Sequence, residues 1–155
     1  MTLKRCLMML AVLALAALPV LAKPNFSGDW KLNVAKSSFG QMPAPSSMTN
    51  KITHEDPKLT SHVKQSGEMG EIEFDANYTT DGKECSNDVF GNPVKSILKW
   101  DGDTLLIDAK GKFGDNDFTS KDKWTLSDDG KTLTITRHFK SSMGEDDHKL
   151  VLEKQ

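Results

Sequence analysis

The residues best suited to bind a ligand in this chain are Asp122 and Arg137. Arg137 is the single arginine after residue 22, where lysine supplies all other strongly basic side chains. A planar guanidinium can bind a carboxylate through two parallel hydrogen bonds and can stack on an aromatic ring. Arg137 could therefore hold an anionic ligand head group. It could also form a structural pair with Asp122 and pack over a tryptophan, and we favour this because the pair already accounts for the charge.

No group of side chains matches a catalytic or metal-binding pattern. The histidines His54, His62, His138 and His148 lack metal-ligand spacing, and strand alternation places His62 and His138 in solvent. Cys85 has no histidine placed to activate it, so we interpret it as a small buried residue. Glycine-rich phosphate loops and nucleophile elbows are missing from the sequence. We expect no catalytic residue, no metal site and no cofactor, and hence no enzyme.

The stretch 122–137 predicts the strand pair that positions Asp122 and Arg137. Apolar and polar residues alternate on both sides of Asp129-Gly130, and an Asp-Gly pair between alternating runs is a strong hairpin signal. The implied register places three pairs on one face: Leu126 with Leu133, Trp124 with Ile135, and Asp122 with Arg137.

Two more Asp-Gly pairs, at 81–82 and 101–102, predict two further hairpins. The first register pairs Tyr78 with Cys85 and Ala76 with Asn87. The second pairs Trp100 with Leu105 and Leu98 with Ile107.

Alternation continues along almost the whole chain after residue 22 and predicts about ten short strands. The expected strands are 25–34, 49–55, 59–65, 70–79, 83–89, 94–100, 104–113, 117–127, 132–140 and 148–154. The Pro- and Ser-rich stretch 35–48 predicts a loop, with one helical turn near 36–39. We therefore expect an all-β fold, an antiparallel up-and-down β-barrel of about 8–10 strands in one domain, 23–155.

One face of the predicted strands combines aromatic side chains with a few polar ones. We propose Tyr78, Trp100, Trp124 and Arg137 on this inner face as ligand-binding residues. Aromatic walls with a few convergent polar groups are typical of small-molecule pockets. A barrel interior filled by side chains would have the same sequence pattern, so both interpretations stay open.

The first 22 residues have the pattern of a cleaved signal peptide. Lys4 and Arg5 precede an apolar run from Cys6 to Leu21, and Val20-Leu21-Ala22 resembles a cleavage site. The run is short for a membrane span. We expect a signal helix over 1–22, cleavage near Ala22, and a secreted or periplasmic protein without stable membrane insertion.

The charge balance argues against a nucleic-acid partner. Without Lys4 and Arg5 the chain keeps 18 basic against 22 acidic residues, which are interspersed. Cys85 is then the single cysteine, so no internal disulfide can form. We expect a monomer whose stability comes from a packed core.

The segment Phe26-Ser-Gly28-Asp-Trp30-Lys-Leu32 resembles the first-strand Gly-x-Trp signature of the calycins, the superfamily of lipocalins and fatty-acid-binding proteins. The resemblance implies a barrel closed by a late-strand arginine over the tryptophan, here Arg137 over Trp30. Ten strands are more similar to the fatty-acid-binding branch. The loop 35–48 replaces the two-helix lid of that branch, and Phe139 stands where its Arg-x-Tyr carboxylate clamp has tyrosine. The chain also resembles small exported lipocalin-like proteins.

Two functions follow from these patterns. The first is an exported barrel that binds a small hydrophobic or amphiphilic molecule. The alternative is a protein-interaction or inhibitor module with a solid core, which binds its partner through loops such as 35–48.

Overall fold

A computed structural model describes residues 22–68 and 70–155. The predicted signal peptide lies outside these ranges except for Ala22, so its helix and cleavage stay predictions. Within these two ranges, no helix is long and apolar enough to cross a membrane.

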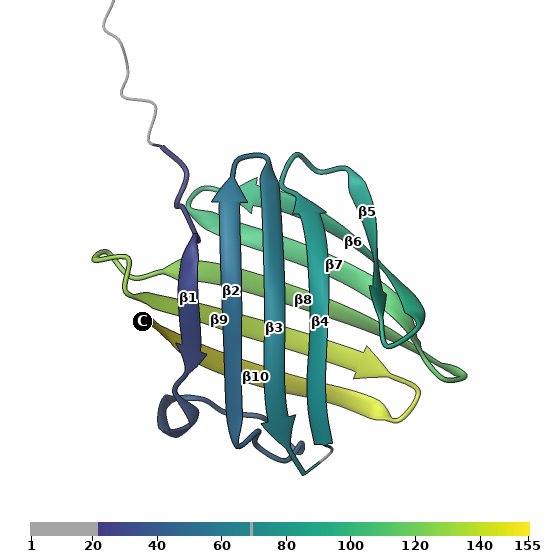
Figure 1. Cartoon of the computed structure of the whole chain (residues 1–155). Coiled ribbons are helices and arrows are strands. Elements are labelled where there is room, and N and C mark those ends of the chain that lie inside the picture. The colour runs from purple at the N-terminus through teal and green to yellow at the C-terminus, as the bar shows by residue number, and fades with distance from the viewer. Residues whose placement is uncertain (1–21, 69) are drawn as a thin grey trace, which may run out of the picture.

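Ten antiparallel strands and one short 3-10 helix, η1, make up the described chain, as the sequence predicts (Figure 1). In order they are β1 (Gly28–Leu32), η1 (Val34–Lys36), β2 (Ser47–Glu55), β3 (Lys58–Gly67), β4 (Gly70–Thr79), β5 (Glu84–Val89), β6 (Asn92–Asp101), β7 (Thr104–Phe113), β8 (Asn116–Leu126), β9 (Thr132–Ser141) and β10 (Gly144–Lys154). β10 begins four residues before the predicted strand 148–154, and η1 lies slightly before the predicted helical turn.

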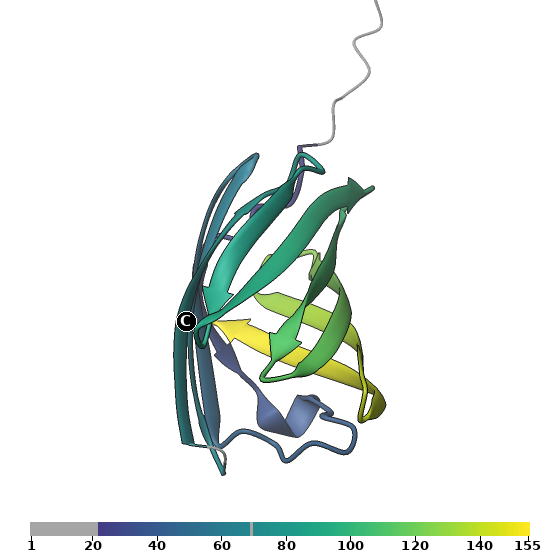
Figure 2. The ribbon, with the colours of Figure 1, turned by 90° about the vertical axis from the view of Figure 1, so that its right-hand side faces the viewer.

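The strands form one sheet in the order β4-β3-β2-β1-β10-β9-β8-β7-β6-β5. Every neighbouring pair is consecutive in the chain except β1 and β10, whose pairing closes the first half onto the second. The sheet curls so that β1–β4 face β6–β10 across the interior (Figures 1 and 2). The predicted up-and-down antiparallel barrel is confirmed.

Two of the predicted hairpin registers are confirmed. Across β8 and β9, Asp122 pairs with Arg137. Across β6 and β7, Trp100 pairs with Leu105. Gly102 and Gly130 have φ angles of 58° and 67°, the left-handed conformation that an Asp-Gly turn requires and that glycine adopts without a Cβ clash.

The predicted hairpin at Asp81-Gly82 is wrong, because β4 and β5 are the two edges of the sheet. Its connection is held by other partners: Thr80 N–H donates to Pro57 O and Gly82 N–H donates to Leu98 O, at 2.8 and 2.9 Å. The Asn87 side chain bridges the two edges instead. Its Oδ1 accepts from Asn77 N–H at 2.7 Å, and its Nδ2 donates to Asn77 O at 3.1 Å.

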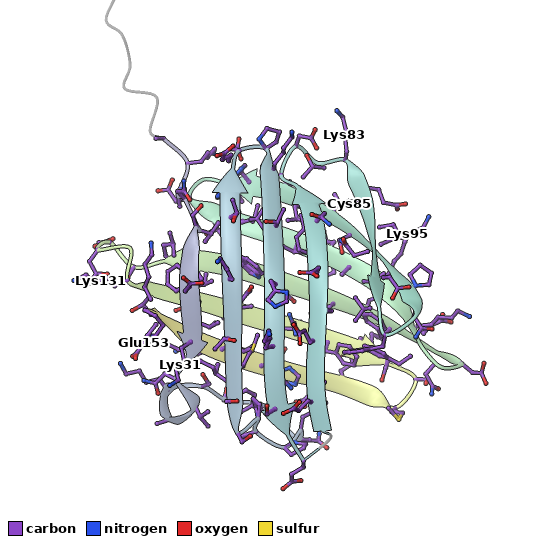
Figure 3. All side chains as sticks on the ribbon, viewed as in Figure 1. Lys31, Lys83, Cys85, Lys95, Lys131 and Glu153 are labelled. Carbon is purple, nitrogen blue, oxygen red and sulfur yellow. The ribbon has the colours of Figure 1, made fainter. Side chains whose placement is uncertain are left out.

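Alternation sends charged side chains outward. Lys83, Lys95 and Lys131 project into solvent (Figure 3). The inward positions carry the core, which is packed most tightly at the end of the barrel where β1 begins. We call this the capped end, because Phe26 lies across it with no exposed surface. Seven large side chains with under 2% exposure form this core: Trp30, Phe26, Leu59, Leu98, Leu105, Leu133 and Leu152.

The opposite end, which we call the loop end, carries the segment 33–46. This segment lies beside the half of β10 that the short strand β1 does not reach. Asn33 N–H donates to Val151 O, and Ser38 and Lys149 exchange two backbone bonds, all at 2.8 Å. Gln41 N–H donates to Asp146 Oδ2, also at 2.8 Å. The segment is therefore fixed to β10 as far as Gln41, and its end is held by Ser46, which donates to Ser66 O on β3.

Candidate ligand-binding site

Inward-facing side chains toward the loop end are only partly buried, in contrast to the capped end. Ile72 and Phe74 on β4 and Phe139 on β9 share the inward register with buried residues, yet all keep accessible surface. The side chain of Arg137 is 37% exposed although it faces the interior beside Asp122. Accessible surface on inward-facing groups means that side chains do not fill this half of the barrel. The interior is thus packed closely at one end and less closely at the other, and we call this less closely packed part the open half.

Asp122 and Arg137 form a close, two-point ion pair in this open half. Arg137 Nε donates to Asp122 Oδ1 at 2.9 Å, and Nη2 donates to Oδ2 at 2.6 Å. Ser120 Oγ also donates to Asp122 Oδ1, at 2.6 Å. The Asp122 carboxylate raises the pKa of Arg137 above its usual value against the opposing effect of burial. The favoured structural interpretation of the pair thus fits its geometry.

Tyr78 reaches the same region from β4. Burial raises the pKa of the Tyr78 hydroxyl to about 12. The charges of Arg137 and Asp122 also act on this pKa from across the interior, with opposite signs. Tyr78 therefore stays protonated in neutral solution and can donate a hydrogen bond.

Cys85 on β5 is a neighbour of this group. Its Sγ donates to Ser96 O at 3.3 Å, and burial raises the pKa of the thiol. A raised thiol pKa is the opposite of what an activated nucleophile needs.

Trp100 and Trp124 lie apart from Tyr78 and Arg137, at the capped end. The Phe26 ring stacks on Trp100 with centroids 5.9 Å apart and contacts Trp124 edge-on at 5.7 Å. Trp100 Nε1 donates to Asp56 Oδ1 at 3.0 Å. Trp124 occupies the inward position next to Asp122 on β8, and its buried Nε1 has no partner among the described residues. Trp124 can therefore form the floor of the open half, whereas Trp100 belongs to the cap.

The predicted contact of Arg137 with Trp30 is wrong. Trp30 is covered by Lys154, whose Nζ lies 5.4 Å from the ring centroid, and the two residues pair across β1 and β10. Gly28 leaves room for that lysine, because a Cβ there would meet Lys154 Cε at 2.5 Å. Arg137 lies too far along β9 for this role, since the bond to Asp122 holds it in the open half.

Sequence reasoning missed a file of aromatic rings that leads from the loop end into the open half. Phe113 stacks on Phe118 at 4.5 Å, and Phe118 stacks on Phe139 at 5.5 Å. Phe90, which is 51% exposed, contacts Phe74 edge-on at 6.1 Å. The rings join exposed positions at the rim to inward-facing ones.

A turn pattern could have revealed this rim. The connections at the capped end contain Asp56-Pro57, Asp81-Gly82, Asp101-Gly102 and Asp129-Gly130, whereas those at the loop end contain Phe39-Gly40, Phe90-Gly91, Phe113-Gly114 and Met143-Gly144. In an up-and-down barrel, alternate connections lie at the same end. The sequence therefore marks the loop end with large apolar residues in four of its connections, which the connections at the capped end lack at the matching position.

The four histidines lie as alternation predicts, and none shows a binding role. His54 accepts from Phe26 N–H at 3.3 Å in the cap, and His148 Nε2 lies 3.3 Å from Asp146 Oδ2. Outside the barrel, His62 and His138 each pair with aspartate. The described residues contain no group of three or more His, Cys, Asp or Glu side chains that could hold a metal ion.

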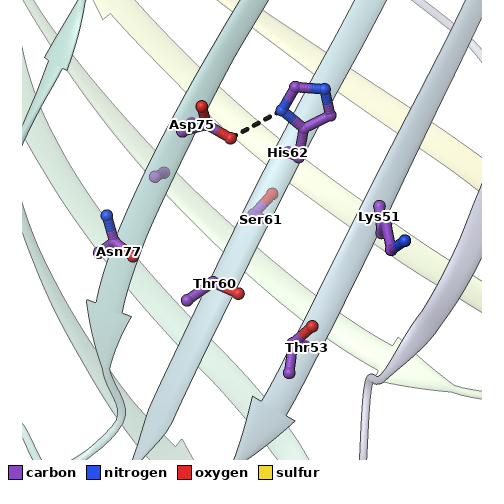
Figure 4. A pocket seen from close by; sticks show the side chains of 8 residues that line it. Lys51, Thr53, Thr60, Ser61, His62, Asp75 and Asn77 are labelled. Carbon is purple, nitrogen blue, oxygen red and sulfur yellow. Dashed lines mark hydrogen bonds and ion pairs between the residues drawn. The ribbon is translucent and has the colours of Figure 1, made fainter.

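A shallow groove of about 340 Å³ crosses the outer face of β2, β3 and β4 (Figure 4). Its lining residues are Lys51, Thr53, Thr60, Ser61, His62, Asp75, Ala76 and Asn77. His62 Nδ1 lies 2.7 Å from Asp75 Oδ1, and His62 Nε2 lies 3.2 Å from Glu73 Oε1. Because its histidine is already paired and the groove is open, we do not assign the ligand site there.

No protein-family model matches the sequence, and no curated protein matches it. Solved structures do match the fold. Secretory abundant heat soluble protein 4 from Ramazzottius varieornatus has a TM-score of 0.58 and 18% identity, over 86% of this chain and 96% of that one. Zebrafish ileal bile acid-binding protein, solved with cholic acid, has a TM-score of 0.59 and 15% identity, over 84% and 98%.

A third structure, a single-residue mutant of the fluorescent protein UnaG, has a TM-score of 0.54 and 16% identity, over 84% of this chain and 96% of that one. At sequence identities this low, the similarity shows a shared fold and nothing further. The chain has the calycin-like barrel that its first strand predicts.

Proposed function

We propose that this protein binds a small hydrophobic or amphiphilic molecule in the open half of its barrel. The observation that carries the proposal is the partial exposure of inward-facing Phe74, Tyr78, Arg137 and Phe139, beside a capped half with a close-packed core. The ligand would lie between these side chains, above Trp124, and would enter along the aromatic file. The zebrafish bile acid-binding protein, solved with cholic acid, supports the proposal through its similar fold.

Filling the open half should abolish binding without unfolding the protein. Ala109 on β7 faces inward between Ser96 and Ser120, and Lys110 beside it faces solvent. Native mass spectrometry should detect a co-purifying small molecule on the unaltered protein and on Lys110→Trp. The Ala109→Trp variant should fold and lack that molecule. A bound molecule that persists on a folded Ala109→Trp variant would contradict the proposed location.

We also propose that the protein acts outside the cytoplasm, which rests on the signal-peptide pattern of residues 1–22. N-terminal sequencing of protein from the exported fraction should begin near Lys23. A cytoplasmic protein that keeps residues 1–22 would contradict export.

The alternative function, partner binding through the loop 35–48, has one observation in its favour. Val34 and Met42 on or beside that loop are 38% and 46% exposed. Exposed apolar side chains can contact a partner protein. This alternative gains weight if no amphiphile binds to either the unaltered protein or Lys110→Trp.

A further inference from the structure

The charge of the one inward-facing arginine is already neutralised. Asp122 is only 6% exposed and accepts hydrogen bonds from Nε and Nη2, along one edge of the Arg137 guanidinium. Ser120 Oγ fills a further acceptor position of the same carboxylate. The pair thus offers no net charge to a ligand.

The groups left over in the open half are hydrogen-bond donors. Within residues 22–68 and 70–155, Nη1 of Arg137 and the Tyr78 hydroxyl make no hydrogen bond to another protein group. At the floor of this half, the buried Nε1 of Trp124 also has no partner among these residues. These three groups come from three strands, β9, β4 and β8. Donors that make no hydrogen bond within the protein can bind acceptor oxygens of a ligand, and the buried Trp124 Nε1 pays a cost while it has no partner. The site therefore favours a ligand that brings acceptor oxygens.

The other charged groups near the open half do not change this balance. Asp146 Oδ2 lies 3.3 Å from His148 Nε2 and accepts from Gln41 N–H at 2.8 Å. Lys154 lies at the capped end over Trp30. The side chains that face the open half therefore carry at least as many negative charges, those of Asp122 and Asp146, as positive ones.

A ligand carboxylate would bind Arg137 weakly, because it would be the second carboxylate beside the same guanidinium. Its attraction to the guanidinium would be opposed by repulsion from Asp122 on the other edge of the same group, because Coulomb energy falls only as the inverse of distance. The ligand anion would also lose its hydration on entering the barrel. An uncharged carbonyl, ester or hydroxyl group avoids both costs and still accepts from the free donors.

From this geometry we infer that the ligand is an uncharged amphiphile, with an acceptor oxygen held by Arg137 Nη1 and Tyr78 and an apolar body against the aromatic file. The inference rests on the proposed ligand-binding function and names its ligand class. Asp122 acts here as the specificity-determining residue, since it cancels the charge that would otherwise attract an anion.

The test compares two ligands with the same hydrocarbon chain, laurate and 1-monolaurin, at pH 8, where the fatty acid is ionised. Tryptophan fluorescence and calorimetry measure the two dissociation constants on the mature protein. We expect 1-monolaurin to bind about tenfold more tightly than laurate, or better. Laurate binding equal to or tighter than 1-monolaurin overturns this inference alone. Binding of neither overturns the proposed function and the inference together.

The Asp122→Asn variant supplies the matched change. It removes the negative charge and keeps a side chain of the same shape, so laurate should gain about tenfold relative to 1-monolaurin. The double variant Asp122→Asn/Arg137→Gln, which has no charge in the site, should return to the preference for 1-monolaurin. An unchanged ligand ratio in folded Asp122→Asn contradicts the role of Asp122. If that variant does not fold, the ratio on the unaltered protein still decides the inference.

Discussion

At the residue scale, two cations fill the two roles that the sequence analysis assigned to Arg137 alone: covering Trp30 and pairing with Asp122. Lys154 covers Trp30 beside Gly28, and Arg137 pairs with Asp122 in the open half. The Gly-x-Trp resemblance implies an arginine over the tryptophan, and the structure places a lysine there instead. The motif does not identify that lysine, because a lysine near the end of a chain looks like any solvated lysine.

The Asp122–Arg137 pair should depend on both partners. Arg137→Met leaves a nearly buried carboxylate unpaired and should cost about 2 kcal/mol, below the range for fully buried pairs because water reaches this half of the barrel. Urea denaturation measures the loss. The double variant Asp122→Leu/Arg137→Met should recover most of it, since removing both charges leaves neither unpaired. A double variant no more stable than Arg137→Met would contradict this account.

At the element scale, the barrel has a seam where β4 and β5 meet without a strand ladder. One carboxamide, that of Asn87, takes the place of the missing backbone bonds. Asp81-Gly82 has the same letters as the two Asp-Gly turns that form hairpins. Its connection differs because Thr80 and Gly82 bond to neighbouring elements, a tertiary effect that a local motif does not encode.

Removing this bridge should loosen the seam. Asn87→Ala should cost about 1 kcal/mol, the usual net value of a hydrogen bond, and should speed amide exchange at Asn77. Ser86→Ala is the control, because Ser86 is the outward-facing neighbour on β5. Unchanged exchange at Asn77 in the Asn87 variant would show that other contacts hold the seam.

The bond between Gln41 and Asp146 should be lost in acid, whereas the backbone bonds of Asn33 and Ser38 to β10 should persist. The pKa of Asp146 is lowered mainly by the hydrogen bond from Gln41 N–H, with a smaller effect from His148. A lowered carboxyl pKa means that the anchor is fully present above the ordinary aspartate range and is lost as pH falls through the lowered value. The amide resonance of Gln41 should titrate with Asp146 and should stop titrating in Asp146→Asn. A resonance that moves with pH in both proteins would contradict this anchor.

At the scale of the whole molecule, the same ten strands run through both halves of the barrel, but the two halves are packed differently. The strand pattern predicts the barrel, its up-and-down antiparallel order and two of its hairpins, because alternation and turn residues are local signals. It does not predict that the interior is filled only near the cap. That division depends on Phe26 reaching across from outside the first strand, and on how large side chains such as Trp100 and Trp124 meet in space.

Ligand uptake should occur at the loop end. Phe90→Asn and Phe113→Ser remove exposed rings from the rim and should slow association several-fold in stopped-flow fluorescence. Phe90 has a φ of 56°, which asparagine adopts more readily than phenylalanine, so Phe90→Asn should not lower stability. Asp101→Asn at the capped end is the control. Equal slowing by Asp101→Asn would place the route elsewhere.

The single thiol within residues 22–68 and 70–155 gives the barrel a built-in attachment point. Cys85 is half-buried, faces inward on β5 and lies among the groups whose charges reach Tyr78. A polarity-sensitive dye coupled there would report whether the interior is wet or occupied, with no engineered cysteine, on protein expressed from Lys23 onward so that Cys6 is left out. Coupling needs alkaline solution, because burial raises the pKa of this thiol. The label would then distinguish empty from loaded protein in a crude extract, before any ligand has been named.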